Sequence, residues 1–144
     1  MFSKTGEYAL RATMVIATAS RNGERLTLER IAERTGMPKA FTAKVLQDLV
    51  RGGVMASSRG PNGGFDLTPL HARKVNLRKV LDAVGEADIT NSCVMGLGGC
   101  NKDLPCPMHK DFIGIKQAIA SLLDRTQVHD LVDDLNKGET YLKR

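Results

Sequence analysis

The fold of this chain is decided by residues 27–51, which read TLERIAERTGMPKAFTAKVLQDLVR. Thr27 is placed to cap a helix whose apolar positions recur at helical spacing, and Gly36 is placed to end that helix. Only Met37 lies between this glycine and Pro38, which suits the first position of the next helix, N1. Two amphipathic helices joined by so tight a turn predict a helix-turn-helix unit.

A β-hairpin is predicted directly after this unit. VMASS at residues 54–58 and FDL at residues 65–67 are typical of strands, and RGPNGG at residues 59–64 is typical of the turn between them. Within that turn, the dipeptide Asn62-Gly63 is the strongest short-range hairpin indication. A helix-turn-helix followed by a hairpin predicts a winged helix.

The outward side of the second helix and the tip of the hairpin carry groups that suit double-stranded DNA. Positive and amide groups on a helix can reach phosphates and base edges in a major groove. Small residues beside Arg59 let a cation approach a narrow minor groove. The residues predicted to contact DNA are Lys39, Ala40, Ala43, Lys44, Gln47, Arg51, Arg59 and Asn62. A solvated helix face and a plain tight hairpin are the alternatives.

Charge is divided unevenly along the chain, whose formal net charge is +5. Residues 1–80 hold 14 Lys and Arg against 6 Asp and Glu, whereas residues 81–144 hold 7 against 10. An anionic partner is therefore expected for the first half only. On charge alone, a basic solvated face explains the imbalance equally well.

Length and composition indicate one ordinary globular domain. The chain has 144 residues, of which 42% are hydrophobic and 26% charged. No apolar run approaches the roughly 20 residues that a membrane span needs. Glu7 and Arg11 interrupt the beginning of the chain, unlike a signal peptide. We therefore expect a cytoplasmic protein without a membrane partner, whose three cysteines are in a reducing compartment and cannot all pair with one another.

All three cysteines fall in the segment CVMGLGGCNKDLPCPMH, residues 93–109, whose glycines and prolines predict a loop. Such a loop can bend Cys93, Cys100 and Cys106 toward one point. Thiolates together with the imidazole of His109 are ligands for zinc or an iron–sulfur cluster. The spacing lacks the two close pairs of a zinc finger and the paired-cysteine redox motif. It favours a cluster and leaves zinc and metal-free thiols as alternatives.

Further helices are predicted over residues 3–20, after Asn76 as cap, over residues 108–124, and after Thr126 as cap. The apolar side of the helix at 108–124 either packs on the chain's own core or forms the seam of a two-fold dimer. The residues predicted for that seam are Phe112, Ile115, Ile119, Leu122 and Leu123.

The sequence resembles a known family in four features: EYALR at residues 7–11, the helix-turn-helix, RGPNGGF at residues 59–65, and the three spread cysteines. Over nearly its whole length it is similar to the bacterial winged-helix iron–sulfur transcription regulators of the IscR/NsrR type. The resemblance implies a mainly helical protein with a small β-hairpin wing. It implies a winged helix-turn-helix DNA-binding domain at residues 1–85, a cysteine-rich cluster-binding loop at 86–107, and dimerisation helices at 108–144.

The resemblance also implies a site. Cys93, Cys100 and Cys106 match the family's cluster cysteines, and His109 stands where IscR-like members place a nitrogen ligand. Glu7 stands where other members place a carboxylate ligand donated across the dimer, so the fourth ligand is open, with His109 favoured because it shares the loop. The first cysteine spacing is one residue longer than usual, and the cluster type, 2Fe–2S or 4Fe–4S, is open.

The function implied is that of a homodimeric regulator, expected to be a repressor, that binds a pseudo-palindromic operator. Its cluster would sense nitric oxide, redox state or iron–sulfur status. The alternative keeps the DNA reader but has its cysteines bind zinc or act as redox thiols. A small cysteine hydrolase using Cys106 and His109 is disfavoured, because no oxyanion-hole helix start is evident, and no enzyme is expected.

Overall fold

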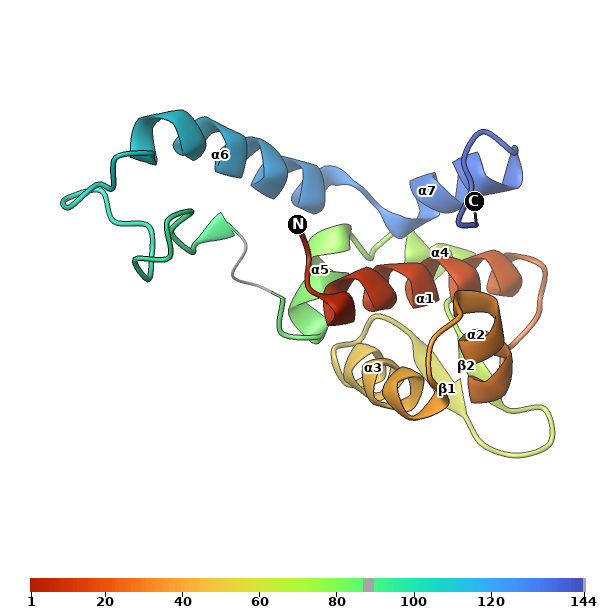
Figure 1. Ribbon diagram of the computed structural model, residues 1–144. Helices are drawn as coiled ribbons and strands as arrows, with labels where there is room; N and C mark the ends of the chain where they lie inside the picture. The colour runs from red at the N-terminus through yellow and green to blue at the C-terminus, as the bar shows by residue number, and fades with distance from the viewer. Residues whose placement is uncertain (87–89, 144) are drawn as a thin grey trace.

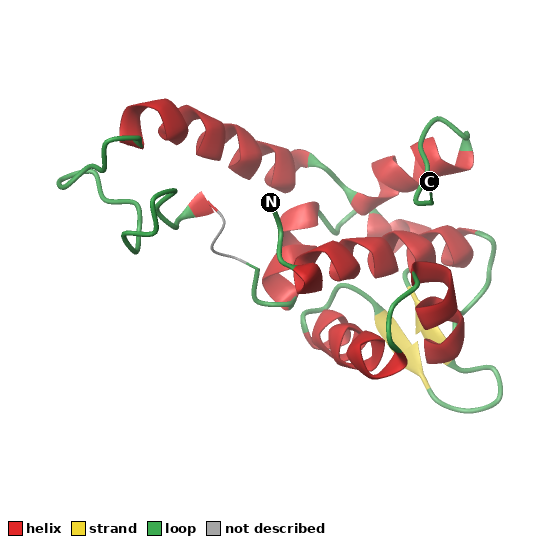
Figure 2. Ribbon diagram, viewed as in Figure 1, coloured by secondary structure: helices red, strands yellow, loops and turns green. Residues whose placement is uncertain are grey.

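The computed structural model describes residues 1–86 and 90–143 (Figure 1). The chain is mainly helical, with one short hairpin at the edge of the helical body, which confirms the mainly helical fold with a β wing (Figure 2). The elements are α1 (Lys4–Arg21), α2 (Leu28–Thr35), α3 (Lys39–Arg51), β1 (Ala56–Ser58), β2 (Gly64–Asp66), α4 (Pro69–Ala72), α5 (Leu77–Ala83), α6 (His109–Arg125) and α7 (Val128–Asn136). None of the described helices is long and apolar enough to cross a membrane.

Helices α2 and α3 form the predicted helix-turn-helix. The Thr27 side chain accepts a hydrogen bond from the Arg30 backbone amide, and Gly36 ends α2 in the left-handed conformation that glycine adopts without a steric penalty. Pro38 was predicted at N1 of α3, and this was wrong by one residue. Its ψ of 135° is extended, so it is the N-cap, and its carbonyl accepts the amide of Thr42 at 2.9 Å.

The wing is a two-stranded antiparallel hairpin in which Ser57 pairs with Phe65. Phe65 also exchanges backbone hydrogen bonds of 3.1 and 2.8 Å with Leu26, which ties the wing to the segment before α2. The first strand is shorter than predicted and the second is shifted by one residue, because Val54 and Leu67 enter the core instead of the ladder.

The turn of the wing differs from the expected Asn-Gly type. The amide of Gly63 donates to the carbonyl of Gly60 at 2.9 Å, so Pro61 and Asn62 are the two central residues. Asn62 has a negative φ, which excludes the two-residue turn typical of Asn-Gly. Proline favours the first central position because its φ is fixed.

Helix α1 runs through the middle of the body and contacts most of the other elements (Figure 1). Ala9, Ala12 and Ile16 are completely buried, and their small or compact side chains allow α2, α3 and α5 to approach closely. The core therefore lies between α1 and the helix-turn-helix unit, and it fixes the orientation of α3.

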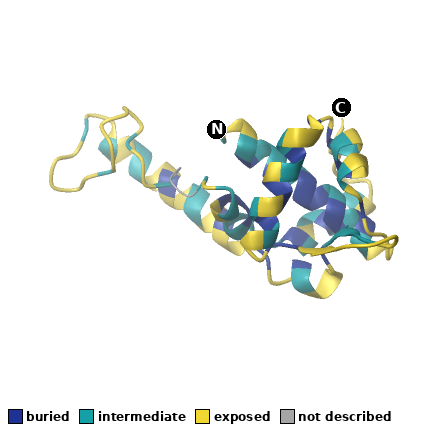
Figure 3. Cartoon of the chain, turned by 90° about the horizontal axis from the view of Figure 1, so that it is seen from below, coloured by how far each residue is buried: buried dark blue, intermediate teal, exposed yellow. Residues whose placement is uncertain are grey.

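Helix α6 projects from this body, and the loop that carries the cysteines lies at its far end (Figures 1 and 3). Its C-terminal part is hydrogen-bonded to α5 and to the segment before α5. There Leu77 N donates to Thr126 O at 3.1 Å, and Val128 N donates to Val75 O at 2.9 Å. Thr126 is therefore the C-cap of α6, and the prediction that it caps the last helix was wrong, since Gln127 takes that position.

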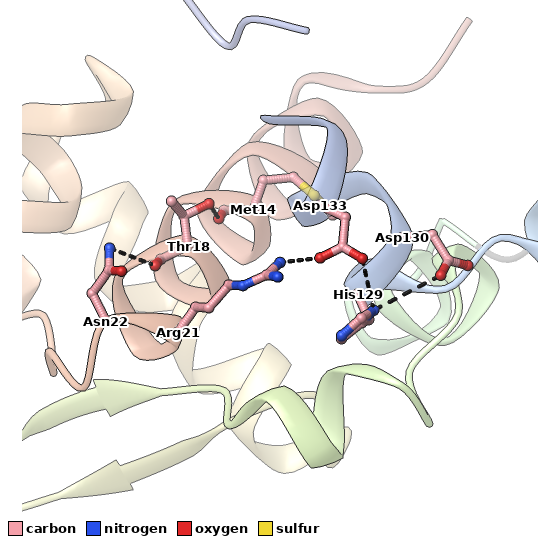
Figure 4. A network of polar contacts seen from close by, with 7 residues as sticks. All are labelled: Met14, Thr18, Arg21, Asn22, His129, Asp130 and Asp133. Atoms are coloured by element: carbon pink, nitrogen blue, oxygen red, sulfur yellow. Dashed lines mark hydrogen bonds and ion pairs between the residues drawn. The ribbon is translucent and has the colours of Figure 1, made fainter. Parts of the chain in front are cut away.

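Helix α7 returns to the body and packs on α1. Arg21 forms an ion pair with Asp133, and His129 Nδ1 lies 3.6 Å from the same carboxylate (Figure 4). Leu131 and Leu135 pack against the core. The apolar side of α7 is thus covered within the chain, which leaves α6 as the exposed member of the two C-terminal helices.

Candidate functional site

The side chains predicted to contact DNA lie on α3 and at the tip of the wing, on the side of the body away from α6 (Figure 1). All of them are exposed except Ala43, which is half-buried. The structure thus brings six predicted residues onto one helix and two onto the adjoining hairpin.

Two of these cations are already paired within the chain. Lys39 Nζ lies 2.6 Å from Glu29 Oε1, which joins the start of α3 to α2, and Arg51 lies 3.2 Å from Asp48. The hydrogen bond from Lys39 is the main reason that the pKa of Glu29 lies below its usual range. Among the predicted contacts on α3, Lys44 and Gln47 are the exposed polar side chains outside these ion pairs.

Three residues that sequence reasoning did not assign to the site support the start of α3. The rings of Tyr8 and Phe41 meet edge to face, with centroids 5.4 Å apart and planes at 73°. The guanidinium of Arg11 lies 5.2 Å from the centre of the Tyr8 ring. Tyr8 and Arg11 belong to the EYALR segment, so that motif gave a signal that could have found this stack.

The loop segment between Asn91 and Cys100 is closed by backbone hydrogen bonds. Cys93 N donates to Gly98 O at 2.7 Å, and Cys100 N donates to Asn91 O at 2.7 Å. Gly96 and Gly98 have φ of 73° and 84°, which only glycine adopts readily. The glycines therefore allow a tight reversal that brings the first two cysteines near each other.

The third cysteine is placed by the start of α6. The amide of His109 donates to the carbonyl of Cys106 at 2.9 Å, so the turn before the helix holds both residues. Cys93, Cys100, Cys106 and His109 line one open hollow. They also line a second, smaller cavity of about 10 Å³, together with Phe112, Ile113 and Lys116.

Two of the four side chains are in direct contact, since Cys100 Sγ lies 3.5 Å from His109 Nδ1. The backbone amides of Leu97 and Met95 are the main groups that lower the pKa of Cys93. Over residues 1–86 and 90–143, no three His, Cys, Asp or Glu side chains converge on a single ion position.

Glu7, the other candidate ligand, lies in the first turn of α1. Its carboxylate is 2.9 Å from Lys4 Nζ, and this hydrogen bond lowers its pKa. Glu7 does not line the hollow of its own chain. Within one chain, the structure therefore brings His109 to the cysteines and leaves Glu7 apart from them.

The predicted seam residues of α6 differ in exposure. Ile115 and Leu122 are 51% and 44% exposed, and Phe112 and Ile119 are half-buried. Leu123 is only 3% exposed, because it lies on the side that faces the body. Met108, which the sequence prediction omitted, is exposed and extends the row. The row is Met108, Phe112, Ile115, Ile119 and Leu122, called here the α6 stripe.

A helix-turn-helix braced by a hairpin, with a basic outward face, defines the class of winged-helix DNA-binding proteins. Residues 2–134 match the Rrf2 family, whose description is iron-dependent transcriptional regulator. The chain belongs to this family, which confirms the resemblance drawn from its motifs.

Relatives and solved structures agree with this membership. An HTH-type regulator of Aquifex aeolicus is 32% identical over 92% of each chain. The regulator IscR of Yersinia pestis is 30% identical over 90% of this chain and 77% of its own. CymR, the global cysteine regulator of B. subtilis, shares the fold with a TM-score of 0.74 at 21% identity, covering 92% of this chain and 96% of its own. IscR of T. potens does so with a TM-score of 0.72 at 20% identity, covering 98% and 92%.

These proteins are transcription regulators and not enzymes, as expected from the sequence. The chain is accordingly an Rrf2-family transcription regulator of the IscR type, and DNA is its expected partner.

Proposed function

We propose that this protein is a homodimeric, iron–sulfur-dependent transcription repressor that binds a pseudo-palindromic operator in the cytoplasm. One observation carries the proposal. Three thiols and one imidazole surround a common hollow at the N-terminal end of the helix that projects from the reading head.

The donor set fits a two-iron cluster. A structural zinc site needs donors that converge on one ion, whereas no three His, Cys, Asp or Glu side chains of the described residues do so. A two-iron cluster takes two protein ligands on each iron, and mixed thiolate and imidazole ligation is known chemistry for it. When bound, the group would supply reversible one-electron chemistry and sensitivity to nitric oxide.

His109 is the preferred fourth ligand over Glu7. It is already beside Cys100, and its position at the start of α6 would connect the cluster directly to the long helix. The backbone amides of Leu97 and Met95 interact favourably with the Cys93 sulfur and lower its pKa. Such interactions stabilise thiolate ligands.

The α6 stripe is proposed as the dimer seam. Its members are spaced alternately by four and three residues, the spacing with which one helix packs against a second. Packing such a row against the same row of a second chain is favourable, because it removes exposed apolar surface from water. A two-fold axis is the commonest symmetry of protein oligomers. The apolar side of α7 is used inside the chain, so we restrict the seam to α6.

The coupling between cluster and DNA would run along α6. A helix of 17 residues spans about 25 Å. Its first residue is the proposed ligand His109, and its last turn is bound to α5 near the reading head. Two heads must lie about 34 Å apart to enter successive major grooves. A change of charge or cross-linking in the loop switches the protein only if DNA binds one dimer state better.

The test is anaerobic purification followed by measurement of iron, sulfide and visible absorbance, with operator affinity before and after nitric oxide. We expect coloured protein whose affinity changes on exposure. Cys100→Ala should lose the absorbance and the response, and Ser121→Ala on the exposed side of α6 is the control. Protein that carries zinc, or neither metal nor sulfide, while still responding to oxidants would favour the alternative of zinc or redox thiols.

A further inference from the structure

Lys116 is the charged side chain that the described part of the chain buries. It lies on α6, seven residues after His109, and it is only 8% exposed. Lysine is rarely buried unless it has a partner. Its ammonium donates a hydrogen bond to the backbone carbonyl of Ser92, the residue before the first cysteine.

No carboxylate in residues 1–86 and 90–143 forms an ion pair with Lys116. Removing an ammonium group from water is costly, and one neutral carbonyl compensates only part of that cost. A buried cation in this position therefore calls for a nearby anion.

The cavity that Lys116 lines indicates which anion this is. Its walls contain Cys93, Cys100, Cys106 and His109, together with apolar side chains, and contain no aspartate or glutamate. The groups in this lining that can carry a negative charge are the sulfur atoms of the three cysteines, as thiolates.

We infer that Lys116 is the counter-cation of the thiolate group, a positioning residue that lets the loop hold an anionic cluster close to the apolar start of α6. This inference rests on the proposed function. Three thiolates make an oxidised two-iron cluster a net anion, and reduction by one electron adds a further negative charge. A fixed buried cation stabilises the reduced form more than the oxidised form, and so it raises the reduction potential.

The expected effect is a redox shift. Lys116→Met should lower the ratio of reduced to oxidised cluster about tenfold at a fixed ambient potential, which is 59 mV for one electron. The measurement is an anaerobic titration with dithionite, followed by visible absorbance and electron paramagnetic resonance.

Two further variants separate charge from hydrogen bonding. Lys116→Gln keeps a donor for the Ser92 carbonyl but carries no charge, so it should behave like Lys116→Met. Lys116→Arg keeps the charge and should stay near the wild-type potential. Lys110→Met is the matched control, because it removes the same charge from an exposed position on the same helix, where water screens it.

A second measurement covers variants whose cluster is too labile to titrate. Iron released to a chelator should appear several times faster from Lys116→Met and Lys116→Gln than from Lys116→Arg or Lys110→Met. Far-ultraviolet circular dichroism of each variant checks that the helices are retained.

The inference is overturned if Lys116→Gln keeps the wild-type potential and iron-release rate, since the lysine would then act only by holding Ser92. Wild-type protein without iron and sulfide refutes the proposed function itself, and this inference with it. If wild-type protein contains the cluster and Lys116→Met has the same reduction potential, this inference is refuted while the proposed function stands.

Discussion

Arg78 at the start of α5 binds Asp124 in the last turn of α6 through two guanidinium nitrogens, one of them 3.3 Å from Oδ2. The same guanidinium donates to the carbonyl of Ala120 at 3.1 Å, and Asn76 donates to the carbonyl of Asp124 at 3.0 Å. The base of the projecting helix is thereby fixed to the helix that packs on α1 and α3. Arg78 follows the wing in a basic segment, but its role is to hold α6 in place.

This ion pair predicts an acid-sensitive attachment of α6. Arg78 holds the pKa of Asp124 below its usual range, so the pair contributes stability that is present above about pH 4 and is lost as the pH falls through the lowered value. Asp124→Asn removes the titrating group. The free energy of unfolding of the wild type should therefore fall more steeply in acid than that of Asp124→Asn, as urea titrations at several pH values would measure. Equal slopes would show that the pair does not stabilise the folded chain.

From the ion pair between Glu29 and Lys39 we predict that the Glu29 carboxylate opposes DNA binding. Glu29→Gln should strengthen operator binding several-fold at low salt, because it removes a negative charge near the phosphates and releases Lys39.

Lys44→Ala should weaken binding to specific and non-specific DNA alike. It should also reduce the slope of the logarithm of the binding constant against the logarithm of the salt concentration by about 1, as expected for one phosphate contact.

Lys137→Ala, an exposed lysine after α7, is the control for these charge changes. Fluorescence anisotropy over a range of salt concentrations measures all three. Weaker binding by Glu29→Gln would mean that the ion pair is needed to hold the start of α3.

The wing turn predicts a position that tolerates only glycine. A Cβ on Gly63 would lie 2.5 Å from the carbonyl oxygen of Ser58 and 2.8 Å from the Arg59 carbonyl carbon, both backbone atoms. Gly63→Ala should distort the wing, lower the free energy of unfolding by about 1–3 kcal/mol and weaken operator binding. Gly114→Ala on α6 is the control, because no heavy atom lies within 4 Å of its Cβ position and Gly114 does not line the cysteine hollow. Thermal unfolding and anisotropy measure the two effects, and a stable Gly63→Ala protein would contradict the close approach.

Much of the fold could be predicted because local signals and packing agree. Thr27 and Gly36 bound α2 as expected, and the apolar periods of α1 and α3 are buried. The helix α4 was missed because it is a single turn, although Thr68 before Pro69 is a recognisable start signal. The turn at Asn62 was misjudged because Pro61 favours a different turn from the one that Asn-Gly favours.

The composition of the loop and the family resemblance predicted Cys93, Cys100, Cys106 and His109 as one group, and the structure places all four around one hollow. Which of these side chains meet was not predictable, since this depends on the reversal closed by the Cys93 and Cys100 amides. Lys116 gave no signal, because one lysine in an amphipathic helix is ordinarily on the exposed side. Its burial depends on where the loop returns against α6, which only tertiary structure fixes.

The two sides of α6 predict opposite consequences for neighbouring leucines. Leu122 belongs to the exposed α6 stripe, whereas Leu123 is buried against the body. Leu122→Glu places a charge in the proposed seam, so it should dissociate the dimer. The chain should stay folded, because the exposed Leu122 side chain contributes little to the stability of the monomer. Leu123→Ala removes a buried side chain and should lower the free energy of unfolding by about 2–5 kcal/mol, without a charge in the seam. Sedimentation equilibrium measures the first effect and urea unfolding the second, and Ser121→Glu, exposed on the same helix, is the control for added charge.

Because the operator is expected to need two heads, Leu122→Glu should also lose high-affinity binding while keeping weak, salt-sensitive binding of single heads. A Leu122→Glu protein that remains dimeric and binds its operator fully would place the seam on another surface of the chain.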